Sequence, residues 1–350
     1  MRLSPQVPAV AVVSIAVAVI VGGMIAGNAE PAPPVLAPLT AQQLLSKVIT
    51  VGESPTSPLS FSGEASSSVN LGFPPIPAGF GGTSTPGLVD LLMSGQTYRV
   101  WQSPDGVRVA NLLRVGERDL IVNTSDGWLW DSTTQTARHL TFDAASMQAR
   151  AQAEQQAGTP PDPATLVTKI VRQLAPFADL SVTTTQWVAG EPGYTLVLTP
   201  TSPSTLVGSV QVALDANNWM PLQLEVFAKG IDTPAIRLGF TSISFGPVDP
   251  STFNFTPPAG ATVTTTALPT GGQLARSTDT QQTQPRTFGT GFDTVIAYRL
   301  TTPMPQQAEA LLPYSGPLAS AITVDTGTGT WVLAGAVPVS ELNATVAQLP

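Results

Sequence analysis

The alternation of apolar and polar side chains in the second half of the chain constrains the fold most strongly. Leu222, Leu224 and Val226 are separated by Gln223 and Glu225. Because successive side chains of a strand point to opposite faces, this pattern predicts a sheet with one apolar and one polar face. Residues 210–215 and 236–241 show the same alternation. A block of antiparallel strands is therefore expected between residues 181 and 244.

A second block of strands is expected upstream of this region. Two turn sequences, Pro-Asp-Gly at 104–106 and Ser-Asp-Gly at 125–127, separate short runs rich in β-formers. These runs predict an antiparallel meander. They cover residues 59–73, 96–103, 106–115, 119–124, 127–132 and 137–142.

Three helices are predicted around these strands. Thr40 and Gln43 have the spacing of a capping box, which opens a helix with apolar positions at 44, 45, 48 and 49. An Ala/Gln-rich helix over 143–158 has a poor apolar face, whereas a helix over 162–177 has a continuous one. Strands, helices and strands again indicate an α+β fold, in which helices cover the apolar side of one curved antiparallel sheet. The stripe of the last helix consists of Leu166, Val167, Ile170, Val171 and Leu174.

The N-terminus predicts a membrane segment. Arg2 precedes an apolar run from Val7 to Ala26, and about 20 residues of helix span a bilayer of roughly 30 Å. The alternatives are a retained anchor, which the length of the run favours, and a cleaved signal peptide. The first gives a protein of the cytoplasmic membrane with its domains outside, and the second gives a secreted one.

The whole chain is predicted to divide into five units. Residues 1–29 are the signal anchor or signal peptide, 30–39 a Pro-rich spacer, and 40–263 the main domain. Residues 264–287 are polar and predict a linker, and 288–350 predict a small C-terminal α/β domain. Its expected elements are a strand at 292–300, a short helix at 305–315, a hairpin at 320–337 and a closing helix at 338–349.

Composition and motifs exclude several classes of function. The net charge is −8 and only three lysines are present, so no basic face is available for nucleic acid. The chain has no cysteine and a single histidine, His139, which predicts neither a zinc site nor any other metal site. No nucleophile elbow, EF-hand or phosphate-binding loop is present. We therefore expect no catalytic residues and no cofactor, and interpret His139 as an exposed strand residue.

Two stretches of sequence resemble a known family. They are the turn and strand with Asp215, Trp219, Pro221 and Leu222, and the segment Val248–Gly260 (VDPSTFNFTPPAG). Together with the order of elements over 40–265, they are similar to the lipoprotein-carrier superfamily, which includes LolA, RseB and mycobacterial lipid-binding lipoproteins. The resemblance implies a half-open β-barrel with a helical lid over an apolar cavity for acyl chains. The anchor departs from the soluble carriers, since a tethered protein cannot shuttle freely between membranes.

The apolar strand faces and the amphipathic helix are the candidate ligand-binding residues. Two alternatives stay open for them: a lipid cavity and a dry, filled core. The Pro/Gly-rich loop 73–87 likewise predicts either a lid or membrane-touching loop, or an insertion with no role. The cavity candidates are Tyr98, Val100, Val107, Val109, Trp128, Trp130, Leu166, Ile170, Leu174, Leu222, Leu224, Val226, Leu238 and Phe240.

Two functions are consistent with these features. The first is non-catalytic, extracytoplasmic binding of a lipid or of the acyl chain of a lipoprotein at the cell envelope. The alternative is an RseB-like regulatory protein that binds a membrane anti-sigma factor. The expected partners are thus a lipid or acylated lipoprotein, the membrane through residues 7–26, and a membrane regulatory protein in the second case.

Overall fold

The computed structural model describes residues 32, 34–53, 59–72, 96–141, 163–267, 285–300, 304, 309–327 and 329–349. Four expectations lie outside these residues. They are the apolar N-terminal run, the loop 73–87, the helix 143–158 and most of the linker 264–287. The short helix expected at 305–315 is described from residue 309, where a turn leads into the strand Tyr314–Ser315.

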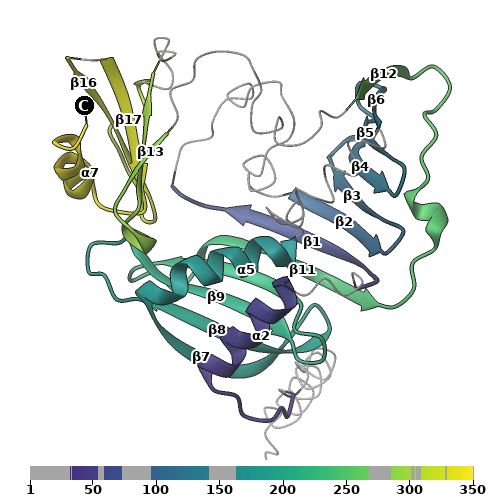
Figure 1. Ribbon diagram of the computed structural model, residues 1–350, viewed down its shortest axis with the longest axis horizontal. Helices are drawn as coiled ribbons and strands as arrows, with labels where there is room; N and C mark the ends of the chain where they lie inside the picture. The colour runs from purple at the N-terminus through teal and green to yellow at the C-terminus, as the bar shows by residue number, and fades with distance from the viewer. Residues whose placement is uncertain are drawn as a thin grey trace, which may run out of the picture.

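A curved sheet of 12 strands forms the main part of the molecule (Figure 1). Its order is β12-β6-β5-β4-β3-β2-β1-β11-β10-β9-β8-β7, and all neighbours are antiparallel except β12 and β6. The sheet does not close, which confirms the α+β half-barrel. The strands are β1 Phe61–Val69, β2 Gln96–Ser103, β3 Gly106–Leu112, β4 Glu117–Asn123, β5 Asp126–Asp131, β6 Thr136–Thr141, β7 Ala178–Val188, β8 Glu191–Pro200, β9 Val207–Asp215, β10 Pro221–Ala228, β11 Pro234–Phe245 and β12 Thr262–Ala267.

Two helices lie across the β7–β11 half of this sheet (Figure 1). Helix α2, Ala41–Glu53, begins at the predicted capping box: Thr40 N donates to Gln43 Oε1 at 2.9 Å, and Gln43 N donates to Thr40 Oγ1 at 3.2 Å. Helix α5, Pro163–Leu174, begins at the expected proline and is followed by the short 3-10 helix η1, Ala175–Phe177. Leu44, Val48 and Val171 are fully buried against the sheet. The amphipathic patterns of both helices therefore locate the main core.

A second sheet follows the linker region and carries its own core. Its order is β13-β14-β17-β16-β15, with helix α7 packed on β16 and β17. Trp331 and Leu333 lie at its centre, and Leu342 of the predicted closing helix is fully buried there. The elements are β13 Arg286–Phe288, η4 Gly291–Asp293, β14 Val295–Arg299, β15 Tyr314–Ser315, β16 Ser320–Thr326, β17 Gly329–Gly335 and α7 Val339–Val346.

The C-terminal unit also contacts the main domain. Leu206 N donates to Ala336 O at 2.7 Å, and the Thr205 hydroxyl donates to the same carbonyl at 2.9 Å. Phe292 and Leu318 are buried members of the main core. Independent folding of residues 288–350 stays a prediction, and these contacts are the ones that an isolated C-terminal unit would lose.

Candidate functional site

The strand registers place part of the predicted apolar face directly beneath the helices. Leu224 pairs with Val212 on one side and with Leu238 on the other, so these three side chains share a face. Helix α5 packs on β10, and Leu174 contacts the same core as Val226. Leu224 is buried, while Val226, Leu238 and Ile170 are half-buried. The side chain of Leu166 lies outside the described part.

A bulge in β10 places Leu222 in a different cluster from Leu224. Pro221 pairs with Leu214 and Gln223 with Ala213, so two steps of β10 correspond to one step of β9. Leu222 then packs in a second core cluster, which is built around the β1–β2–β11 part of the sheet. Other members of this cluster are Phe61, Tyr98, Val100 and Phe240. The residues predicted to form one side of the cavity are thus divided between two packed clusters.

The registers also divide the residues predicted on the first block of strands. Val100 pairs with Val109, Val109 with Leu120, and Leu120 with Leu129, so these four side chains form one row on the sheet. Val107 lies on this face too, since it is two residues from Val109. Residues 128 and 130 flank Leu129, so Trp128 and Trp130 point to the opposite face. Both tryptophans were predicted to line the same side as Tyr98, because alternation within a strand does not show the register between hairpins.

The opposite face carries an aromatic cluster that includes the single histidine. The His139 ring stacks on Trp128 with centroids 4.1 Å apart, and its Nε2 lies 2.9 Å from Asp126 Oδ2. The Phe255 ring packs on both Trp128 and Trp130, with ring centroids 5.4 and 5.7 Å apart. His139 is therefore half-buried and paired, where an exposed residue was expected. Within the described residues, no three acidic, histidine or cysteine side chains are close enough to hold a metal ion.

The row Val100–Val109–Leu120–Leu129 is apolar but incompletely covered. It shares its face with Leu224, because Leu238 and Phe240 lie two residues apart on β11 and Phe240 pairs through Ala65 with Tyr98. The cover along the row is uneven: Val100 is buried, Val109 and Leu129 are half-buried, and Leu120 is 38% exposed. The apolar face beneath α5 therefore continues beyond the helices. Sequence reasoning missed Leu120 and Leu129, although the alternation of the two strands contained the signal.

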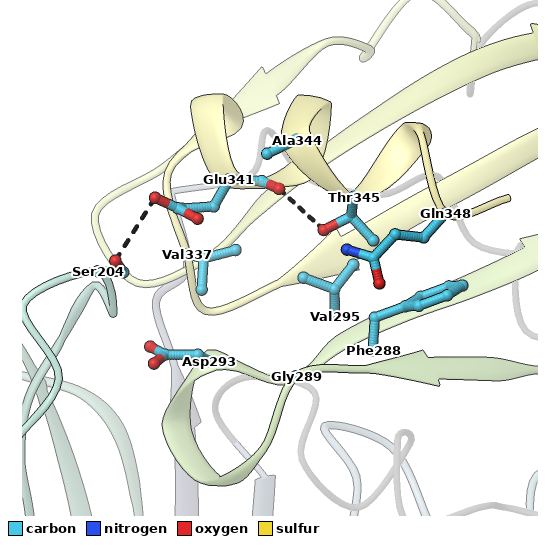
Figure 2. Close-up of a pocket in the computed structure, with 10 residues that line it drawn as sticks. All are labelled: Ser204, Phe288, Gly289, Asp293, Val295, Val337, Glu341, Ala344, Thr345 and Gln348. Atoms are coloured by element: carbon cyan, nitrogen blue, oxygen red, sulfur yellow. Dashed lines mark hydrogen bonds between the residues drawn. The ribbon is translucent and has the colours of Figure 1, made fainter.

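A pocket of about 210 Å³ lies between α7, η4 and the main domain (Figure 2). Two carboxylates, Asp293 and Glu341, face it, and no basic side chain is among its lining residues. The Ser204 hydroxyl of the main domain donates to Glu341 Oε1 at 3.4 Å, while Asp293 Oδ1 is buried with no hydrogen-bond partner. The remaining lining residues are Phe288, Gly289, Val295, Val337, Ala344, Thr345 and Gln348.

The turn between β9 and β10 holds helix α2 on the sheet. Asp215 Oδ1 accepts hydrogen bonds from Asn217 N and Asn218 N, both at 2.8 Å, and Trp219 follows with a left-handed φ of 66°. The Trp219 ring then stacks on Tyr194 at 5.9 Å, and the ammonium of Lys47 from α2 lies 4.9 Å above it. The residues of this turn therefore join α2 to β8.

Two carboxylates lie close together at the same end of the sheet. Asp215 is fully buried and its Oδ2 has no hydrogen-bond partner. Burial, and then the charge of Asp215, raise the pKa of Glu191 above its ordinary value. The folded protein therefore binds a proton at Glu191 more readily than the unfolded chain does. Its stability falls as the pH rises from the pKa of Glu191 in the unfolded chain to its higher pKa in the folded protein.

Replacing Glu191 with glutamine is thus expected to raise the melting temperature at neutral pH. The difference should vanish in acid below the ordinary range of the carboxyl, where Glu191 is protonated in both states. Thermal unfolding of both proteins across this range measures it. Glu309→Gln, at an exposed position, is the control. A constant difference at every pH would show that the charge of Glu191 is not its cause.

Comparisons with known proteins place this geometry among solved folds. No protein-family model and no curated protein matches the chain. The MucA/MucB complex of Pseudomonas aeruginosa matches with 16% identity and a TM-score of 0.44, covering 87% of this chain and 96% of that one. A LolA superfamily protein of Nitrosomonas europaea matches with 11% identity and a TM-score of 0.23, covering 62% and 99%. The chain is similar to MucB and to a LolA superfamily protein. At these identities the likeness concerns the fold alone.

A third solved structure is a putative outer membrane lipoprotein-sorting protein domain of Vibrio parahaemolyticus. It matches with 10% identity and a TM-score of 0.22, covering 61% of this chain and 97% of that one. Among the described residues, no helix is long and apolar enough to cross a membrane, and the apolar run 7–26 is not among them.

Proposed function

We propose that the protein binds a lipid or the acyl chain of a lipoprotein, without catalysis, at the outer face of the cytoplasmic membrane. The observation that carries the proposal is the half-exposed row of Val109, Leu120 and Leu129 on the helix-covered face of the sheet. An acyl chain laid along this row would cover apolar surface at about 25 cal/mol per Å². The resemblance to carrier proteins in the turn at Asp215–Leu222 and in Val248–Gly260 supports the same function.

The helices suit a cover for such a ligand. Apolar residues of α2 and α5 pack on the sheet, and Thr168 Oγ1 donates to Val48 O at 3.2 Å, which joins one helix to the other. The two helices therefore form one joined layer over the apolar face that includes Leu224.

The test is a polar substitution in the exposed part of the row. Leu120→Gln is expected to weaken binding of a fluorescent fatty acid several-fold, because an amide must then be desolvated against the acyl chain. Its free energy of unfolding should change by only about 0.5 kcal/mol, as at other surface positions. Displacement titration and urea unfolding of the same preparations measure both quantities.

The matched control is another leucine with almost the same exposure. Leu59, which precedes β1, is 39% exposed against 38% for Leu120 and lies outside the row. Leu59→Gln should leave fatty-acid binding unchanged. If the unaltered protein binds no fatty acid, or if both variants lose affinity equally, the row is not a ligand surface.

A membrane regulatory protein as partner is the second candidate. The pocket between α7 and the main domain favours it, because Asp293 and Glu341 are suited to a basic side chain from another protein. Apolar side chains beside them, such as Val295 and Val337, would contact the stem of that side chain. Such a partner would bind equally well to the protein and to its Leu120→Gln variant, which separates the two candidates.

A further inference from the structure

The described chain begins at a position that is fixed on the sheet. Trp187 Nε1 donates to Ala32 O at 2.8 Å, and the Tyr194 hydroxyl donates to Ala37 O at 2.7 Å. Leu36, between the two bonded residues, and Leu39, after them, pack against the main core. Residues 30–39 were predicted to be a Pro-rich spacer. In the described part of that stretch, Ala32 and residues 34–39 lie along the end of β7 and β8, and we call these residues, with Trp187, the N-terminal corner.

The geometry points to the N-terminal corner as a surface that rests on the outer leaflet of the bilayer. This inference rests on the proposed location of the protein, with the run Val7–Ala26 as its anchor. Only six residues, 27–32, connect the end of that run to the bond at Trp187. At 3.3–3.6 Å per residue, they reach about 22 Å at most. The corner is therefore held within that distance of the bilayer, whatever path these six residues take.

The side chains at the corner suit an interface between lipid and water. Trp187 is 44% exposed and Val35 is fully exposed. Tryptophan prefers the boundary of a membrane, where its ring is in apolar surroundings and its N–H has a polar partner. Here the N–H already donates to Ala32 O, so the ring can enter the boundary without an unpaired donor. One residue thus fixes the tether and offers an apolar surface to lipid.

Fluorescence quenching in the bilayer tests this orientation. The chain has no cysteine, so one introduced cysteine carries the only label. Val35→Cys labels the corner, and Val115→Cys labels the tip of the β3–β4 hairpin; these valines are 100% and 82% exposed. Val115 comes after the last residue of β3. This strand starts at the end of the sheet where Phe61 and Ser103 lie, and its seven residues extend about 24 Å away from that end. The full-length protein is placed in phosphatidylcholine nanodiscs that contain a headgroup-spin-labelled lipid.

Quenching of the label at residue 35 is expected to exceed that at residue 115 several-fold. Adding Trp187→Ala to the Val35→Cys protein should reduce the difference, because it frees Ala32 and removes the ring. Trp187→Phe should keep part of the quenching, since it retains an apolar ring. Equal quenching at both positions, or none at either in protein that is retained in the nanodisc, would overturn the inference.

The outcome separates this inference from the proposed function. A soluble protein that begins near Glu30 would show that no anchor is retained, and the corner would then have no bilayer to rest on. Fatty-acid binding and its loss in Leu120→Gln are measured independently of the nanodisc. The orientation can therefore fail while lipid binding holds, and the reverse.

Discussion

The free energy of unfolding of the variant Arg108→Gln is expected to be about 3–5 kcal/mol lower than that of the original protein. Arg108 on β3 donates from Nε to Asp119 Oδ2 at 3.1 Å and forms a second bond through its terminal nitrogen. The Asp119 side chain is fully buried, and its Oδ1 has no other partner. Removing the guanidinium leaves a buried carboxylate without a counter-charge, which is among the costliest single changes in a protein interior.

Urea unfolding measures this loss, and an exposed pair provides the control. Arg99 Nε lies 3.0 Å from Glu64 Oε1, but the two side chains are 51% and 45% exposed. Arg99→Gln should therefore cost about 1 kcal/mol or less. The double variant Arg108→Met with Asp119→Leu should recover most of the stability, because it removes both buried charges. Equal losses from Arg99 and Arg108 would contradict the assignment.

The second large effect is expected in helix α2. Leu44 is fully buried against the sheet, where Leu196, Leu198 and Val212 are also fully buried. Leu44→Ala removes three carbons from this core and should lower the free energy of unfolding by about 2–5 kcal/mol, because the surrounding side chains fill the space only in part. Leu120→Ala, at a position 38% exposed, should change it by about 0.5 kcal/mol.

The same pair of variants also relates stability to ligand binding. Leu44→Ala acts on the contact between helix and sheet, whereas Leu120→Ala acts on the uncovered row. Fatty-acid affinity should fall in Leu120→Ala although its stability is retained. Urea unfolding and displacement titration of both variants test this. A stable Leu44→Ala protein would mean that α2 is not held by the core described above.

Local patterns in the sequence predicted the elements well. The alternation around Leu224, the turns at 104–106 and 125–127, and the capping box of Thr40 and Gln43 all act within a few residues, and each is confirmed. The residues that share a wall of the site could not be predicted as well. That property depends on register, and the bulge at Leu222 changes it by one residue.

Interactions between distant residues were also beyond local reasoning. The hydrogen bond of Trp187 to Ala32 joins residues 155 positions apart, so a Pro-rich stretch that reads as a spacer is held on the sheet. Trp128 and Trp130 were predicted on the ligand face because alternation within their own strand does not show which side chains point to which face of the sheet. Only the pairing of Leu120 with Leu129 decides which side faces the helices.

The position of β1 in the sheet governs when the protein can fold. This early strand lies in the middle of the order, between β2 and β11, and Phe61 pairs with Phe245, 184 residues later. Chains are made from the N-terminus at about 5–20 residues per second, so the partner of Phe61 appears roughly 10–40 s after it. During that interval one long edge of β1 and the apolar side of α2 have no native partner. Until β11 is made, the unpaired edge of β1 and the apolar side of α2 can pair with wrong partners. The nascent chain therefore depends on its surroundings to prevent such pairing.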